Sequence, residues 1–165
     1  MEFEIQPKSV NELAEQLVAT GVQTNKYAQV LLESNYYDPA VSGRFTVELV
    51  NLSDLGFDEP ATLQHVYERA QATGYCLCPL ELAPYARMQW LEQAQSNTSI
   101  LSGTHSMPDS AVNVATPVLS EDHTFPKGFY LRVVDGVPWL RGYRCDDTYL
   151  FPLESCFMFV LPPEN

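Results

Sequence analysis

Apolar and polar positions in the N-terminal part of the chain follow the period of an α-helix. The sequence S-x-x-E at residues 9–12 has the form of a capping box, and the apolar positions after it lie three or four residues apart until Gly21. The same spacing predicts a second helix over residues 25–34. Together they predict a helical hairpin over residues 9–34, whose apolar side the rest of the domain must cover. The apolar positions of the first helix are Val10, Leu13, Ala14, Leu17 and Val18.

Residues 45–93 are predicted to mix strands with helices. The run 45–50 is rich in β-branched and aromatic side chains, which is typical of a strand. A helix is predicted between Thr62, a suitable N-cap, and Gly74, which tolerates the left-handed conformation of a C-terminal cap.

Two runs with β patterning flank the dipeptide Asp135-Gly136, which favours the two-residue turn of a β-hairpin. The register set by this turn places Arg132 opposite Trp139. Pro138 fits this register only if its nitrogen points away from the first strand, which puts the second strand at a sheet edge or a bulge. The predicted strands cover residues 129–134 and 137–143.

Residues 156–161 are apolar at every position, which predicts an internal strand covered on both faces. We therefore predict a single α+β domain over residues 1–165, in which N-terminal helices pack on a mostly antiparallel sheet with a C-terminal β-hairpin and a buried last strand. Its predicted parts are the helical hairpin 9–34, the mixed α/β segment 45–93, an irregular insertion 94–126 with strands near 98–103 and 112–119, and the β-rich part 127–162.

The formal net charge of −12 limits the partners that the chain can have. An acidic surface lacks the footprint of a general nucleic-acid binder, and no apolar run approaches the roughly 20 residues of a membrane span. The acidic start does not resemble a signal peptide, and the four cysteines are expected to be reduced because the core needs no disulfides. We therefore expect a soluble, cytoplasmic, bacterial protein that is a monomer or weak homodimer and has no cofactor.

Residues 127–144 contain four basic residues and one acidic residue, the main local concentration of positive charge. In the predicted hairpin, one face is a core face, and the other combines arginines with aromatic rings. Arginine beside such rings can stack on flat ligands or bind an anion through its planar fork. We predict that this face binds another protein or a small anionic ligand, although an ordinary solvated sheet face has the same pattern. The predicted binding residues are Tyr130, Arg132, Trp139, Arg141 and, from a neighbouring segment, Gln89.

A catalytic alternative depends on Cys78. We expect a short strand over residues 75–78 and then a helix that Pro79 opens and Pro84 keeps short. At a helix N-terminus the pKa of the Cys78 thiol would fall, and a histidine would serve as base. The other candidates for such a hydrolase or transferase are Glu81 and Arg87, although Glu81 in the first turn is also a favourable helix-dipole contact. No catalytic residue is assigned on this pattern, because no nucleophile signature surrounds the cysteine.

Metal binding has weak support in the sequence. The histidines His105 and His123, with Asp109, Glu121 and Asp122, could meet around a divalent ion, but their spacing matches no known ligand loop. Cys76 and Cys78 have no second Cys/His pair to complete a zinc site. We therefore predict no metal site.

Several short motifs occur in a distinctive order along the chain. They are DLGF at 54–57, AT at 61–62, LCPLE at 77–81, RMQW at 87–90 and DGVPWL at 135–140. In this order they resemble a family of short, functionally uncharacterised bacterial proteins with the pattern DLGF…AT…LCPxE…P…R-x-Q-[YW]…DG-x-x-WL. The resemblance covers roughly residues 45–161, and the chain departs from the family pattern after Gln93. It implies no established activity. Some members are labelled helicases, but this chain lacks the phosphate-binding loop of such a motor.

These observations favour a non-catalytic protein- or ligand-binding module. The first alternative is the small hydrolase or transferase built on Cys78, Glu81 and Arg87. The second is an acidic inhibitor or antitoxin-like partner, whose charge would steer it to a basic protein.

Overall fold

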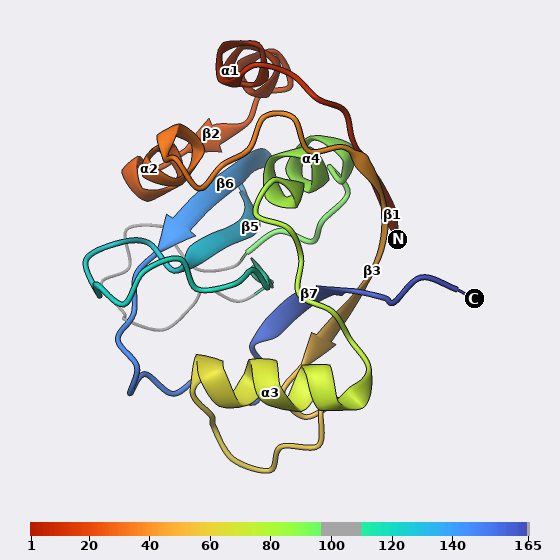
Figure 1. Cartoon of the computed structure of the whole chain (residues 1–165), viewed down its shortest axis with the longest axis vertical. Helices are drawn as coiled ribbons and strands as arrows, with labels where there is room; N and C mark the ends of the chain where they lie inside the picture. The colour runs from red at the N-terminus through yellow and green to blue at the C-terminus, as the bar shows by residue number, and fades with distance from the viewer. Residues whose placement is uncertain (97–109, 165) are drawn as a thin grey trace.

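The computed structural model describes residues 1–96 and 110–164 (Figure 1). Its helices and strands form an α+β fold, as the sequence predicts. Within the described residues, no helix has the length and apolar content needed to cross a bilayer. The helices are α1 (Val10–Ala19), α2 (Lys26–Glu33), α3 (Leu63–Thr73) and α4 (Leu82–Gln89). The strands are β1 (Glu2–Ile5), β2 (Gln23–Thr24), β3 (Gly43–Asn51), β4 (Val112–Val114), β5 (Gly128–Val134), β6 (Val137–Tyr143) and β7 (Cys156–Val160).

The helix ends follow local capping chemistry. The Ser9 hydroxyl accepts a hydrogen bond from the backbone N–H of Glu12 and donates one to the Glu12 carboxylate, which confirms the predicted N-cap but not the reciprocal bond of a full capping box. Thr62 caps α3 in the same way, and Gly74 ends that helix in the left-handed conformation with φ 109°. The predicted helical hairpin contains an unpredicted element, because the two-residue strand β2 separates α1 from α2 and pairs with β6.

The strands form one sheet in the order β1-β3-β7-β4-β5-β6-β2. The sheet is mixed, because β4 runs parallel to β7 and β2 runs parallel to β6, whereas the remaining neighbours are antiparallel. The prediction of a mostly antiparallel sheet is therefore only partly right. The last strand, β7, lies inside the sheet between β3 and β4, and its residues Phe157, Met158 and Phe159 are fully buried, as predicted.

The β5–β6 hairpin has the predicted turn and register, with Arg132 opposite Trp139 and Val133 opposite Pro138. Asp135 and Gly136 both have positive φ, 50° and 77°, which is the geometry of the favoured two-residue turn. In such a hairpin the pair next to the turn, Val134 and Val137, is hydrogen-bonded, and the next pair, Val133 and Pro138, is not. The nitrogen of Pro138 therefore points away from β5. β6 is not the edge strand that Pro138 predicted, because β2 follows it in the sheet, but β2 pairs only with Trp139 and Leu140, so no ladder bond at Pro138 is lost.

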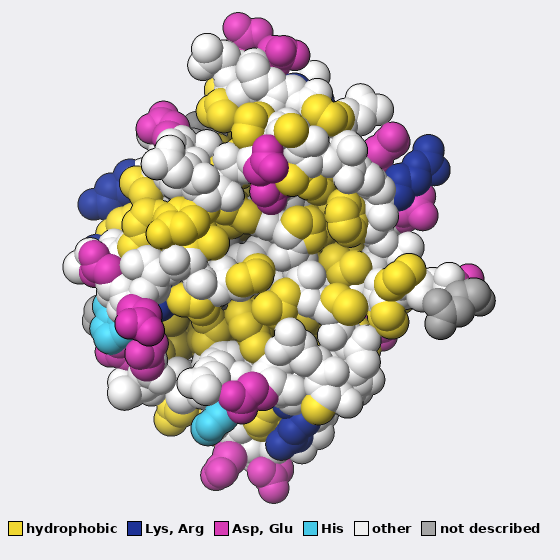
Figure 2. Space-filling view, viewed as in Figure 1, with side chains coloured by type: hydrophobic (Ala, Val, Ile, Leu, Met, Phe, Trp, Pro, Cys, Tyr) yellow, Lys and Arg dark blue, Asp and Glu magenta, His cyan; other side chains and the backbone are white. Residues whose placement is uncertain are grey.

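Hydrophobic side chains cover both faces of the sheet. One cluster joins the α1, α2 and α4 side to Leu131 and Leu140, and the other joins α3 to Tyr130 and Phe157. Figure 1 shows the same division, with α3 at the bottom and the other helices above. In Figure 2, hydrophobic side chains gather across the middle of the face that is shown, and charged side chains lie mostly around its rim.

Two predictions for residues 75–89 are wrong. Residues 75–78 form no strand, and Cys76 makes only an isolated bridge to Val160. Helix α4 begins at Leu82 rather than at Pro79, and Pro84 lies in its first turn, where a helix needs no N–H donor. Of the two strands expected in the insertion, the second is the shorter β4, and the first lies outside the described residues.

Candidate functional site

The hairpin face that was predicted to bind a partner is largely covered. Tyr130 exposes 8% and Arg132 exposes 1% of its surface. Tyr143 packs edge-on against both Tyr130 and Phe151, so the chain after β6 folds back over this face beside α3. The expectation that Tyr130 and Arg132 face solvent is therefore wrong, because the alternation of a strand defines two faces without saying what covers each.

Trp139 and Arg141 are only partly buried, on the same face of β6. The guanidinium carbon of Arg141 lies 5.1 Å from the centroid of the Trp139 ring and 5.9 Å from that of Tyr130. Its Nε donates a hydrogen bond of 2.8 Å to the Tyr130 hydroxyl. Arg141 therefore lies against both rings, and the buried Tyr130 holds its guanidinium in place, an arrangement that an ordinary sheet face can also have.

Gln89 is on α4, which packs against the face of the sheet opposite to this stack. Its side-chain amide pairs with the backbone of Glu4, accepting from the N–H at 3.0 Å and donating to the carbonyl at 2.7 Å. Glu4 belongs to β1, an edge strand of the sheet. The structure therefore gives Gln89 an edge-covering role and does not bring it together with Trp139 and Arg141.

Cys78 is not placed as an activated nucleophile. It is 1% exposed and lies four residues before α4, and its Sγ donates to the carbonyl of Met158 at 3.3 Å. Burial raises the pKa of the Cys78 thiol to about 12, the opposite of the shift that the catalytic alternative needs. The thiol is therefore protonated at neutral pH.

Glu81 and Arg87 also have structural partners, and each lies against a different part of the chain. Glu81 is 6% exposed, and its carboxylate accepts a hydrogen bond from the backbone N–H of Asp38 at 3.3 Å. Arg87 is fully buried and donates to the Gln93 side chain at 2.6 Å and to the Arg132 carbonyl at 3.3 Å. The three catalytic candidates therefore do not converge on a common point.

Arg87 and Gln93 together form a carbonyl clamp beside β5. β4 pairs with β5 only at Tyr130 and Leu131, and beyond this point residues 95–96 lie along β5, where the Ser96 N–H donates to the Val133 carbonyl at 2.8 Å. The Gln93 amide donates to the carbonyls of Leu131 and Ser110, and Arg87 adds a donor to the carbonyl of Arg132 on β5. Burial lowers the pKa of Arg87 to about 10, which still leaves the side chain charged at neutral pH. Sequence patterns gave no signal for Gln93, because its role depends on where β4 ends.

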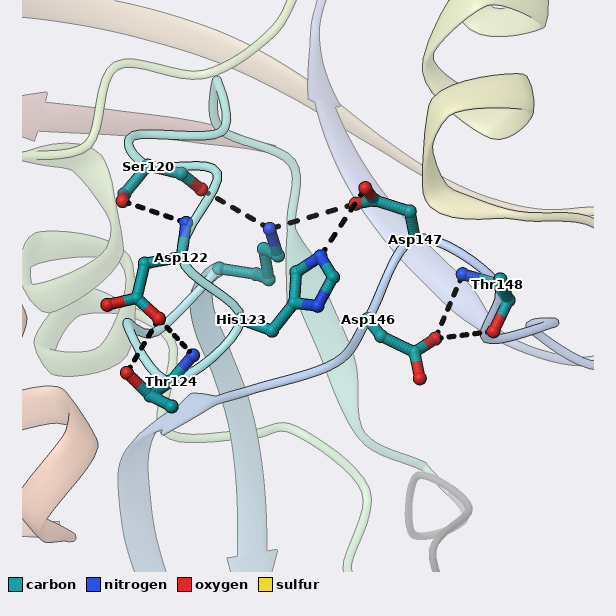
Figure 3. Close-up of polar contacts among 8 residues, drawn as sticks. Ser120, Asp122, His123, Thr124, Asp146, Asp147 and Thr148 are labelled. Atoms are coloured by element: carbon teal, nitrogen blue, oxygen red, sulfur yellow. Dashed lines mark hydrogen bonds and ion pairs between the residues drawn. The ribbon is translucent and has the colours of Figure 1, made fainter.

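Two surface turns repeat the sequence Asp-x-Thr (Figure 3). In the first, Asp122 accepts from the backbone N–H of Thr124 at 2.9 Å and from its hydroxyl at 2.7 Å, and in the second, Asp146 accepts from Thr148 at the same distances. These hydrogen bonds to the charged form lower the pKa of both aspartates. Each turn is therefore held by its own carboxylate.

The two turns meet through His123 and Asp147, whose Nε2 and Oδ2 atoms are 3.4 Å apart (Figure 3). Lys127 contacts the segments of both turns: its Nζ donates to the Ser120 carbonyl at 3.3 Å and lies 4.0 Å from the Asp147 carboxylate. Within the described part of the chain, no three His, Cys, Asp or Glu side chains are placed to hold a metal ion. His105 and Asp109 lie outside the described residues. The contacts support a structural role in joining the two loops.

No protein-family model matches the chain, and neither the curated proteins nor the solved structures contain a match. The resemblance described from the sequence motifs therefore stays a prediction. Functional conclusions for this chain have to come from its own residues.

Proposed function

We propose that this protein is a non-catalytic binding module that contacts its partner through Trp139 and Arg141. The observation that carries the proposal is the burial of all three catalytic candidates in separate structural contacts. A side chain that is buried and bonded to backbone groups is a poor general base or nucleophile, because substrate cannot reach it.

The Trp139–Arg141 stack has the chemistry of a recognition surface. Both residues are partly accessible to solvent, and none of the ion pairs between described residues involves Arg141. The guanidinium therefore has donors available for a carboxylate, and the indole offers a flat apolar surface beside them. A partner group that combines an anion with a flat ring fits this surface best, either in a protein or in a small ligand.

Tryptophan fluorescence provides the test. The chain contains two tryptophans, so Trp90→Phe leaves Trp139 as the reporter. The probe is benzoate, a flat anion, with neutral benzyl alcohol as the comparison. We expect saturable quenching by benzoate, and about ten-fold weaker binding after Arg141→Met is added, because a charge-assisted hydrogen bond is lost.

Arg44→Met is the matched control, because Arg44 is an exposed arginine on β3, near the other end of the sheet, and removing it changes the net charge by the same amount. Benzoate binding should be unaffected by this change. Equal quenching by benzyl alcohol, or equal benzoate affinity with and without Arg141, would contradict the proposal.

We also propose that the protein works in the bacterial cytoplasm, as a monomer or weak homodimer related to the resembled family. Its four cysteines are free thiols, which supports a reducing compartment. The acidic composition supports a protein partner rather than nucleic acid. Within the described residues, no observation specifically favours the hydrolase or transferase alternative.

A further inference from the structure

A second group of basic side chains surrounds Tyr27, at the start of α2. The Nζ of Lys26 lies 5.1 Å from the centroid of the Tyr27 ring, and the guanidinium carbon of Arg144 lies 4.5 Å from it. Both basic residues are exposed. Figure 2 shows basic side chains at the edge of the molecule beside α2. Two cations from distant parts of the sequence therefore meet at one ring.

Close backbone packing brings these cations together. Asn25 accepts from the N–H of Gly142 at 2.8 Å and donates to its carbonyl at 3.0 Å, which fixes the start of α2 against β6. A Cβ at position 142 would lie 2.6 Å from the Tyr27 carbonyl carbon and 2.8 Å from the Ala28 nitrogen. Only glycine permits this approach. The approach fixes the start of α2, where Lys26 lies, against the end of β6, which Arg144 follows.

The charges at this corner have no acidic partner in the described part of the chain, because none of the ion pairs there includes Lys26 or Arg144. Two positive charges on one ring repel each other, and a bound anion would relieve that repulsion. The positive end of the α2 dipole lies at the same place. Asn25 caps the N–H of Ala28, whereas the N–H groups of Lys26 and Tyr27 have no partner within the helix.

We propose that Lys26, Arg144 and the N-terminus of α2 form a binding site for the phosphate group of a small molecule. A phosphate dianion has enough charge for two cations and enough oxygens for both the guanidinium fork and the free amides. A carboxylate has half of that charge, so it should bind this site more weakly than a phosphate dianion does.

This site is independent of the Trp139–Arg141 stack. Gly142, which contacts Tyr27, is opposite Phe129 on the core face of β6, whereas Arg141 and Trp139 are on the other face. Failure of one site therefore leaves the other unaffected. The phosphate site also gives the acidic chain a small-molecule ligand that its net charge alone would disfavour.

The test is a titration with inorganic phosphate at constant ionic strength, followed by the backbone amide signals in ¹H–¹⁵N NMR spectra. We expect saturable shifts of the Lys26 and Tyr27 amides, and much weaker shifts with acetate at the same concentration. A parallel titration with adenosine monophosphate separates the two sources of a phosphate group, because tighter binding than inorganic phosphate indicates a phosphomonoester ligand and equal binding indicates free phosphate.

Lys26→Met and Arg144→Met should each weaken phosphate binding about ten-fold, as expected for the loss of one charge-assisted contact. Arg44→Met should leave it unchanged. Because Lys26 and Arg144 are exposed, both variants should keep the amide spectrum of a folded protein. The proposal is overturned if phosphate gives no saturable shift, if acetate acts equally well, or if Arg44→Met weakens binding as much as Arg144→Met. The benzoate titration followed by Trp139 fluorescence should be unchanged in Arg144→Met.

Discussion

Replacing Arg87 by methionine tests whether this residue is structural. The substitution keeps a long flexible side chain in the buried site but removes every hydrogen-bond donor of the guanidinium. It leaves the carbonyls of Arg132 and Trp90 and the side chain of Gln93 without the bonds that Arg87 now supplies. Arg132 and Gln93 are buried, so water does not readily replace the donor that these two acceptors lose.

The size of the effect follows from these contacts. A hydrogen bond from a charged donor contributes about 1.5–3 kcal/mol, and the three bonds share one side chain, so their contributions do not add. Burial of the methionine thioether recovers about 1–2 kcal/mol of this loss. We therefore expect the free energy of unfolding to fall by about 3 kcal/mol, a large part of the about 5–15 kcal/mol that a domain has.

Urea unfolding followed by circular dichroism measures this change. With a denaturant slope of about 2 kcal/mol per molar, the midpoint should fall by about 1.5 M. Arg44→Met is again the control, because the Arg44 side chain is 69% exposed and pairs only with surface glutamates. Its midpoint should move by less than about 0.5 M, because surface ion pairs contribute little. A decrease of less than about 1 kcal/mol for Arg87→Met would refute the carbonyl clamp and make Arg87 available for catalysis again.

Three further predictions concern packing and thiol chemistry. Gly142→Ala should lower the free energy of unfolding by about 3 kcal/mol in the same urea assay, because the new Cβ would overlap the backbone of α2, and an unchanged midpoint would contradict the close approach. The free energy of unfolding should also fall above about pH 9, because burial raises the pKa of Cys78 to about 12 and of Cys156 to about 11. Between pH 9 and these values only the unfolded state loses the thiol protons, so the free energy of unfolding falls by about 1.4 kcal/mol per pH unit for each thiol. Urea midpoints at pH 8, 9 and 10 measure this, and midpoints that stay constant would show that the thiols are not buried. Iodoacetamide at pH 8 should modify the partly exposed Cys76 much faster than Cys78 in the folded protein, as read by peptide mass spectrometry, and fast labelling of Cys78 would restore the nucleophile hypothesis.

Local sequence signals predicted the elements whose causes are themselves local. The N-cap at Ser9, the cap at Thr62 and the turn at Asp135-Gly136 each depend on a few neighbouring residues, and each is present in the structure. The hairpin register followed from the turn, since a two-residue connection leaves one way to pair the strands. The apolar run of β7 predicted its internal position, because a strand that is apolar at every position has to be covered on both faces.

The candidate site was harder to predict, because burial depends on segments that are distant in sequence. Arg132 looked like a solvent-facing residue in the strand pattern, yet its face of the sheet is covered. Gln93 carries no motif, and its role appears only where β4 stops short along β5. Lys26 and Arg144 are separated by most of the chain, so no local pattern joins them at Tyr27.

Two side-chain amides occupy positions where another polypeptide could otherwise pair with the sheet. Gln89 bonds both backbone groups of Glu4 on β1, and Asn25 does the same for Gly142 on β6. Hydrolysis of either amide to a carboxylate would remove the N–H donor and place an anion against a backbone carbonyl. Such a chemical ageing step changes the mass by about one dalton, yet it would open an edge to strand exchange between copies and so favour self-association.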